Sequence, residues 1–480
     1  MSQPTTQPAS PFRVIAILSV AAFVVILNET IMSVALPRLM VEFNITEATV
    51  QWVTTAFMLT MAVIIPTTGW ILTRFRIRSV YLAAMAIFTI GTVVAALAPV
   101  FLLLVVGRVI QAIGTAIMMP LLMTTVLNLV PFEKRGRVMG IVGMVISAAP
   151  ALGPTVGGII LEQLDWRWMF WTVLPIAVLT LIIGGALMRN VTETRPMKLD
   201  TLSVVLSAVG FSGLIYGLSS LGEAARGVAL FPAWIPLVIG GASLSVFVLR
   251  QLTLGHNAFL NVRVFAVPTY AFAIILTMIS SMAMFGTFIV LPIYIQQVLG
   301  FDAQIAGMVM LPSGVLMGVL GVFVGRMFDA VGARPLLIPG SLIAATGLWG
   351  MVTLHASSPL WSVILWNILM AVGIGMMMGP LMTSALSALP GRLYQHGSAI
   401  FSTLQQVAAA GGTALYITVM SVAAVVGAGQ GEDALTAQMT GMHNALIWGA
   451  VLMLIPVIGT IFFRPKPHVE QPQPETVAAD

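Results

Sequence analysis

One acidic and one basic side chain lie deep inside apolar stretches of this chain. Glu29 is the only carboxylate well inside a long apolar run, and Arg108 is the only basic residue left inside one. A charge near the middle of a bilayer is costly unless it is paired or hydrated, so such residues mark functional sites by default. The two residues therefore predict acid–base or ion-pair chemistry within a membrane.

Their positions in the sequence predict that Glu29 and Arg108 lie at the same depth. The run over residues 14–36 leads outward, and it ends about seven residues, or roughly 10 Å of helix, after Glu29. The run over residues 101–127 enters from the same side, about seven residues before Arg108. We expect the two side chains to be partners.

Two interpretations of the Glu29–Arg108 pair are open. A static ion pair would only hold two helices together, and buried pairs are weak evidence even for stability. Alternatively, Glu29 exchanges a proton. Removal from water favours its neutral form, whereas an opposing arginine or a cationic substrate favours its ionised form. A carboxyl group under these two opposing influences can exchange a proton for a substrate, and we prefer this second interpretation.

Fourteen long apolar runs must position these side chains. The chain is 59% hydrophobic and 8% charged, whereas a soluble domain has about 25% charged residues. A window of about 20 apolar residues suits a membrane-spanning helix, whose backbone satisfies its own polar groups. We therefore predict an all-α membrane protein with fourteen transmembrane helices.

Basic residues alternate between the gaps that separate these runs, as the positive-inside rule requires. The odd-numbered gaps hold only Arg38, Arg167 and Arg226. Both termini are therefore expected on the cytoplasmic side of the cell membrane. The N-terminus, the even-numbered gaps and the C-terminal tail hold seventeen of the twenty-one Lys and Arg residues: Arg13, Arg74, Arg76, Arg78, Lys134, Arg135, Arg137, Arg189, Arg195, Lys198, Arg250, Arg263, Arg326, Arg334, Arg392, Arg464 and Lys466.

The chain contains a weak internal sequence repeat. The loop sequence at 69–78 follows the second run and reappears at 325–334 after the tenth, an offset of 325 − 69 = 256 residues. Matched halves are typical of transporters, with the substrate site between them near the midplane. The predicted organisation is a disordered N-terminal tail (1–12), a six-helix bundle (13–190), two additional central helices (191–265), a second six-helix bundle (266–464) and a disordered C-terminal tail (465–480).

The loop sequences resemble the G-x-L-A-D-R-x-G-R-R motif of the major facilitator superfamily, and the helix count resembles its fourteen-helix drug:proton antiporter branch. The first loop has Thr73 where the motif has Asp, which argues against a charge relay in that half. For Asp329 we expect a gating contact with a nearby arginine or a helix N-terminus. The resemblance implies gating roles for the residues that match it: Gly69, Arg74, Arg78, Gly325, Asp329 and Arg334.

Two helix motifs extend the resemblance. The fourth-run motif R-x-x-Q-G-x-G matches at Arg108 and Gln111, and the family's first-helix Asp is replaced by Asn28, with the acid one residue later. A shift of the acidic residue by one position turns its carboxylate about 100° around the helix. Asn28 and Gln111 thereby join Glu29 and Arg108 as candidate proton-coupling or substrate residues. The fifth-run antiporter motif matches at Gly140, Gly153, Pro154, Gly157 and Gly158.

Other polar and sulfur side chains are secondary candidates. Methionines cluster in the repeated fourth and twelfth runs, where most are expected to pack in the core, although Met also suits promiscuous apolar surfaces. Gln405 and Gln406 lie together in the thirteenth run.

Several functional classes lack support in the sequence. The net charge of +5 comes from loops that orient helices, so no nucleic-acid partner is expected. The chain has no Cys, and it shows no phosphate-binding Gly-Lys motif, metal-ligand cluster or Ser-His-Asp set. We therefore expect neither an enzyme nor a bound cofactor or metal.

The sequence favours a monomeric, proton-coupled exporter of amphipathic, drug-like compounds, with substrates, protons and membrane lipids as its partners. Two alternatives stay open: a transporter of a defined metabolite or lipid, and a non-transporting membrane scaffold.

Overall fold

The computed structural model describes residues 11–45, 47–50, 52–131, 134–188, 199–225, 232–255, 258–431 and 433–464. This part of the chain contains fourteen helices that are long and apolar enough to cross a membrane, and no β-strand. The prediction of an all-α, fourteen-helix membrane protein is confirmed. The predicted disordered tails lie outside the described residues except for residues 11 and 12.

The membrane helices are named in their order along the chain. The first six are α1 (Pro11–Ile31), α4 (Trp52–Arg74), α5 (Ile77–Ala96), α6 (Phe101–Leu129), α7 (Arg135–Gln163) and α8 (Trp168–Leu187). The next two are α9 (Thr201–Ala225) and α10 (Trp234–Leu254). The last six are α11 (Pro268–Ile293), α12 (Ala303–Val331), α13 (Arg334–Val352), α14 (Leu360–Ser387), α15 (Tyr394–Gly429) and α16 (Ala434–Phe462).

Short helical pieces connect some of these spans. After α1 the chain continues as a 3₁₀ turn, η1 (Met32–Val34), and a short helix, α2 (Leu36–Phe43). The first membrane helix therefore ends five residues before the predicted run does. The remaining pieces are α3 (Glu47–Val50), η4 (Val262–Ala266), η5 (Tyr294–Val298) and η6 (Gly391–Leu393).

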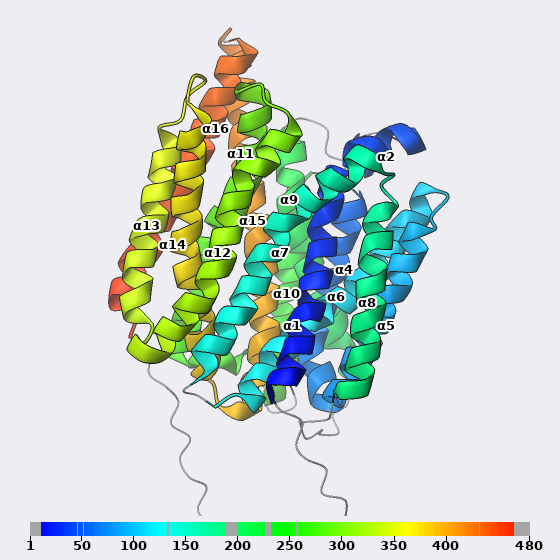
Figure 1. Cartoon of the computed structure of the whole chain (residues 1–480). Coiled ribbons are helices and arrows are strands. Elements are labelled where there is room, and N and C mark those ends of the chain that lie inside the picture. The colour runs from blue at the N-terminus through cyan, green and yellow to red at the C-terminus, as the bar shows by residue number, and fades with distance from the viewer. Residues whose placement is uncertain are drawn as a thin grey trace, which may run out of the picture.

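Two helix bundles stand side by side, with α7 and α12 between them (Figure 1). We call the end of the molecule where α1 begins and α4 joins α5 the basic end, because the arginine-rich loops gather there. The other end is called the opposite end. Since α7 begins at the basic end and α12 finishes there, the two helices run antiparallel.

Glycines bring the backbones of α7 and α12 together near the basic end. A Cβ atom on Gly140 would collide with the carbonyl oxygen of Gly321, and one on Gly325 would collide with that of Gly136. Small residues allow such close helix packing in membranes, where apolar burial gives little driving force.

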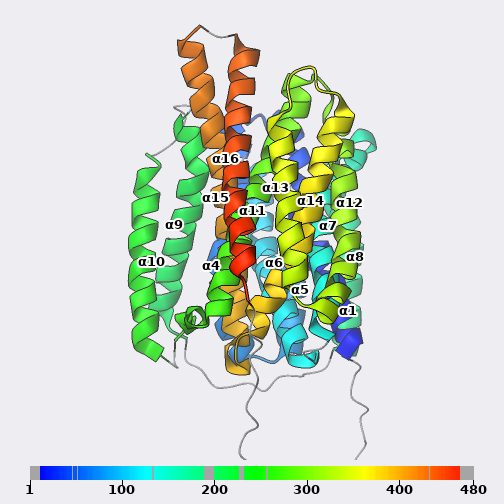
Figure 2. The same cartoon turned by 90° about the vertical axis from the view of Figure 1, so that its left-hand side faces the viewer.

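The two additional helices are central in the sequence but peripheral in space. Helix α9 packs against both α4 and α15, and α10 packs mainly against α9 (Figure 2). This pair therefore covers the side of the molecule where α4 of the first half meets α15 of the second, away from α7 and α12.

Candidate substrate and proton site

A buried polar cluster joins α1 to α6 near the end of α1. Arg108 is fully buried, and its Nη1 donates to the side-chain oxygen of Asn28 at 3.0 Å and to that of Gln111 at 3.1 Å. The same guanidinium reaches the backbone carbonyls of Asn28, at 3.3 Å, and Glu29, at 3.5 Å. Its carbon lies 4.2 Å from the centre of the Phe57 ring of α4. Arg108 thus binds the last turn of α1.

Gln111 extends this cluster to α5. Its Nε2 donates to the hydroxyl of Thr92 at 2.8 Å, and that hydroxyl donates to the Phe88 carbonyl at 2.8 Å. All three residues are fully buried. The Gln111 amide is therefore held between Arg108 and Thr92, and it accepts from the same Arg108 nitrogen that donates to Asn28.

Glu29 lies beside this cluster rather than inside it. Its carboxyl group faces the Arg108 guanidinium and the amide of Gln406 on α15. Among the described residues, however, none of the salt bridges within 4.0 Å includes either Glu29 or Arg108. The two predicted partners are brought together, but Asn28 takes the direct contact.

The cluster keeps unused hydrogen-bonding capacity. Within the described part of the chain, Asn28 Nδ2 and Arg108 Nε are buried and have no hydrogen-bond partner. Buried polar groups are nearly always paired, so an exception calls for an explanation. These two donors are therefore unused in this structure.

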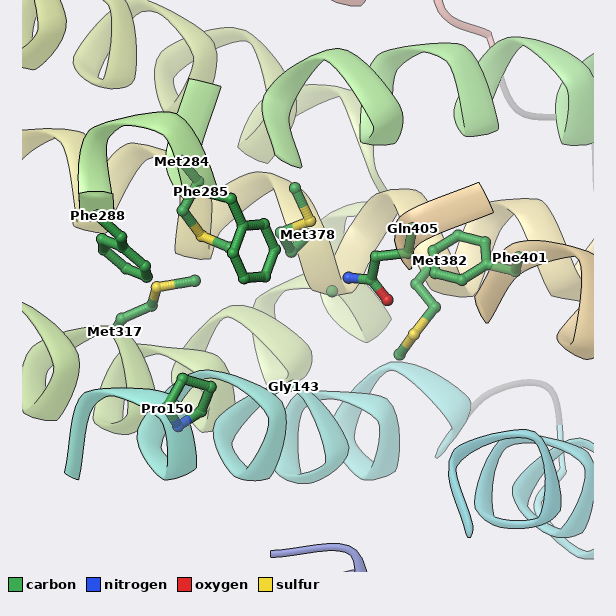
Figure 3. Close-up of a pocket in the computed structure, with 11 residues that line it drawn as sticks. Gly143, Pro150, Met284, Phe285, Phe288, Met317, Met378, Met382, Phe401 and Gln405 are labelled. Atoms are coloured by element: carbon green, nitrogen blue, oxygen red, sulfur yellow. The ribbon is translucent and has the colours of Figure 1, made fainter. Parts of the chain in front are cut away.

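A cavity lies between α7 and the second half of the molecule, and its empty space, open solvent included, is about 600 Å³. Figure 3 shows the amide of Gln405 projecting into the same space as Met378 and Met382, across from Gly143 and Pro150 of α7. No ionisable side chain of the described residues lines it. The lining residues are Gly143, Pro150, Met284, Phe285, Phe288, Met317, Met378, Gly379, Met382, Phe401 and Gln405.

The methionine cluster is divided between this cavity and the core. Met378 and Met382 line the cavity, whereas Met118, Met123 and Met377 are fully buried in the apolar core. Gln405, a secondary candidate in the sequence, is the one side chain with an amide group among the described residues that line the cavity.

Asp329 of α12 binds the first turn of α7 at the basic end. One carboxylate oxygen accepts from the backbone N–H of Gly136 and the other from that of Arg137, both at 2.7 Å. The N-terminus of a helix carries unpaired N–H groups and a partial positive charge, so an aspartate is favoured there. Asp329 therefore makes a charge-assisted contact between the two halves.

Further contacts join the halves at the same end. Arg135 of α7 donates to the hydroxyls of Ser387, at 3.4 Å, and Tyr394, at 3.2 Å. The Thr124 and Ser398 hydroxyls are hydrogen-bonded at 2.8 Å. These bonds hold α6 and α7 against α14 and α15.

The last arginine of each repeated loop has the same role in its own half. Arg78 donates to the Gly185 carbonyl near the end of α8 at 2.6 Å, and Arg334 donates to the Ile461 carbonyl near the end of α16 at 3.1 Å. A cation is favoured at a helix C-terminus, where carbonyls lack partners. These two candidates thus cap helices within a half instead of linking the halves.

The first-half loop otherwise differs from the second. Thr73, in place of the aspartate, donates to its own helix at the Gly69 carbonyl, and Arg74 is exposed. A Cβ atom on Gly69 would lie 3.3 Å from Nδ1 of His396, so Gly69 lets α4 approach α15. Among the described residues, Thr73 therefore does not repeat the contact that Asp329 makes between the halves.

The fifth-run motif glycines pack the other end of α7 against α1. A Cβ atom on Gly153 would collide with the side chain of Thr30, and one on Gly157 would lie 2.8 Å from the Ile31 carbonyl. Gly158 faces open space, and the side chain of Pro154 lies outside the described residues. Helix α7 thus contacts the residues next to Glu29 at one end and Asp329 at the other.

Two residues that contact the polar cluster, Phe57 and Thr92, were not predicted from the sequence. Phe57 carries no signal that separates it from other apolar residues of α4. Thr92 is a polar residue in an apolar run, but such threonines commonly bond their own helix, as its hydroxyl also does here.

Comparisons with known proteins agree on one family. The family model described as "Major Facilitator Superfamily" matches residues 18–413. The lincomycin resistance protein LmrB of Listeria monocytogenes is 39% identical over 463 residues, which cover 95% of this chain and 98% of the relative. LmrB of Bacillus subtilis is 36% identical over 478 residues, covering 96% and 98% of the two chains.

More distant matches support the same fold. A multidrug resistance protein B homolog of Mycobacterium tuberculosis is 29% identical over 419 residues, which cover 86% of this chain and 77% of the relative. The crystal structure of the human organic anion transporter MFSD10 aligns with a TM-score of 0.66 and 16% identity, covering 95% of this chain and all of that one. At this identity the structure supports the fold alone.

Proposed function

Because the chain belongs to the major facilitator superfamily, we propose that it exports amphipathic, drug-like compounds, lincomycin-type antibiotics among them, in exchange for protons. The observation that carries this proposal is the 39% identity over nearly the full length of both chains to a protein named for lincomycin resistance. The name describes that relative, and its extension to this chain is our inference.

The cavity between the halves suits the substrate class. Its methionine and phenylalanine side chains offer a deformable, largely apolar surface, which favours compounds of varied shape. Gln405 supplies both a donor and an acceptor to the polar part of a ligand. Ligand sites are usually apolar with few polar groups, and this cavity has that composition.

Glu29 is the proton site in this proposal. It is the one carboxylate that lies well inside a long apolar run of the sequence, and it faces Arg108 without a direct ion pair among the described residues. A carboxyl group that is not already neutralised by a bonded guanidinium can accept a proton at a smaller energetic cost. The cluster around Arg108 then holds the end of α1 in place while Glu29 changes its charge.

The basic end faces the cytoplasm of the cell membrane in this account, with both termini on that side. The contacts of Asp329 and Arg135 would then close the cavity toward the cytoplasm and favour release to the outside. Alternating access requires these bonds to break and re-form in each cycle. The protein works as a monomer in lipid, and its other partners are substrate and protons.

A susceptibility assay tests the proposal. Expression in a lincomycin-sensitive bacterial host should raise the inhibitory concentration of lincomycin several-fold, and a protonophore should abolish accumulation differences between expressing and control cells. A host whose lincomycin susceptibility and accumulation do not change would contradict the proposed substrate. Protection that survives the protonophore would contradict the proton coupling.

A further inference from the structure

Helix α15 presents two neighbouring stripes of residues to different parts of the molecule. Phe401 and Gln405, four positions apart, share one face and line the cavity. Ser398, Ser402 and Gln406 share the next face, about 100° around the helix. Gln405 and Gln406 are thus consecutive residues with different surroundings.

The second stripe faces the first half of the molecule. Near the basic end, the Ser398 hydroxyl is bonded to that of Thr124 in α6. Farther along, Gln406 Nε2 lies 3.6 Å from the sulfur of Met61 in α4, and the same amide faces the carboxyl group of Glu29. Between them, the Ser402 hydroxyl is buried without a partner in the described residues.

We propose that Gln406 is a positioning residue that transmits the protonation state of Glu29 to the substrate cavity through a shift of α15. This role rests on the proposed proton-coupled export. An ionised Glu29 attracts the Gln406 amide and draws α15 toward α1. A protonated Glu29 attracts it less, so α15 shifts and moves Gln405 and Phe401 in the cavity wall.

Few other groups can carry this signal. Arg108 is a charged side chain inside one of the helices that surround Glu29. The other charged side chains of these helices lie in their end turns. Helix α8 carries no charged residue, and α15 carries only His396 near its start. The remaining charges on α1, α4 and α7 are Arg13, Arg74, Arg135, Arg137 and Glu162.

Arg108 responds to Glu29 as well, but its bonds lead away from the cavity. They run to Asn28, Gln111 and through Gln111 to Thr92, all within the first half. Gln406 is the polar side chain that faces Glu29 from the half that holds most of the cavity wall.

The test measures lincomycin binding to the purified full-length protein across pH. Because proton and substrate compete, wild-type affinity should rise as pH rises and Glu29 ionises. Gln406→Met keeps the length of the side chain but removes the amide, so the pH dependence should flatten. Glu29→Gln should flatten it equally, and the double variant should add nothing further because both changes break one link.

Two matched variants separate this role from simpler ones. Gln438→Met makes the same change on α16, where the Gln438 amide contacts Gln297, and should keep the wild-type pH profile. Gln405→Ala removes the cavity amide and should weaken binding by the same factor at every pH.

Two results would overturn the role of Gln406. One is a Gln406→Met protein with the full wild-type pH profile, and the other is one that loses affinity uniformly, as Gln405→Ala should. Wild-type affinity that does not change with pH would instead contradict the proposed proton coupling, and with it the role of Gln406.

Discussion

At the scale of single residues, Arg108 organises the site through geometry as much as through charge. Its planar guanidinium reaches the Asn28 and Gln111 side chains and two carbonyls of α1, while its face lies on Phe57. A lysine carries the same charge but has neither the fork nor the flat face. The two residues are therefore not interchangeable here.

We expect Arg108→Lys to reduce export at least tenfold with normal membrane levels. Each hydrogen bond to a charged group contributes about 1.5–3 kcal/mol, and at least one such bond is lost. The measurement is initial lincomycin flux in reconstituted vesicles, divided by the amount of protein. Wild-type flux would mean that charge alone suffices at this position.

The sequence predicted which residues meet, but not which atoms bond. Depth along each helix follows from counting residues, so Glu29 and Arg108 could be matched. The rotation of α1 about its axis depends on packing, such as that of Gly153 against Thr30, and this rotation turns Asn28 to the guanidinium. Gln406 faces Glu29 from the other half, and its pairing depends on how the halves are placed.

At the scale of helices, Asp329 links α12 to the start of α7. Asp329→Asn keeps the size of the side chain but removes the charge that two backbone N–H groups share. Losing a cap costs about 0.5–2 kcal/mol, so the basic end should open more readily. We expect slower export at normal membrane levels, measured as flux in reconstituted vesicles.

Asp302→Asn is the matched control for this change. Asp302 lies at the other end of the same helix, is exposed and makes no capping hydrogen bond through its side chain. It should leave flux unchanged. Equal effects of the two substitutions would show that Asp329 acts only through general charge.

A hydrogen-bonded ion pair links the two additional helices, α9 and α10, at the basic end. Asp200 accepts from Arg250 Nε at 2.9 Å and from Nη2 at 3.0 Å, and the Ser203 hydroxyl donates to it at 2.6 Å. These bonds lower the pKa of Asp200 to about 2. Because the pKa is lowered in the folded protein, the stabilisation is present above the unfolded value of about 4 and is lost as pH falls toward 2.

We therefore expect Asp200→Asn to lower the thermal unfolding midpoint at pH 7. The difference from wild type should shrink as pH falls from about 4 to about 2, where Asp200 itself takes a proton. Thermal unfolding of the purified protein at several pH values checks this. A difference that stays constant down to the lowest pH would exclude the Asp200–Arg250 bond as its cause.

At the scale of the whole molecule, the apolar runs predicted the helix count, and the internal repeat accounts for the matching caps of the two halves. Fourteen helices follow from the length and apolarity of the runs, and the paired caps at Arg78 and Arg334 reflect the repeat. The position of α9 and α10 could not be derived, since their apolar surfaces fit lipid and protein alike. Membership of the major facilitator superfamily, expected from the loop and helix motifs, is confirmed.

The orientation in the membrane is testable because the chain has no native cysteine. Single cysteines in place of Gln163 and Ser357, both exposed at the opposite end, should react with an impermeant maleimide in intact cells. A cysteine in place of Ser79, exposed at the basic end, should react only after the membrane is opened. Labelling of Ser79→Cys in intact cells would reverse the proposed orientation.

The central claim is that Glu29 exchanges the proton that drives export, and one measurement tests it most directly. Lincomycin uptake into inverted membrane vesicles is followed under an imposed pH gradient, with proton release recorded in parallel, for wild type and Glu29→Gln. The glutamine keeps the shape of the side chain but cannot gain or lose a proton. The account predicts retained lincomycin binding with neither gradient-driven uptake nor proton release. Full gradient-driven uptake by Glu29→Gln would contradict it.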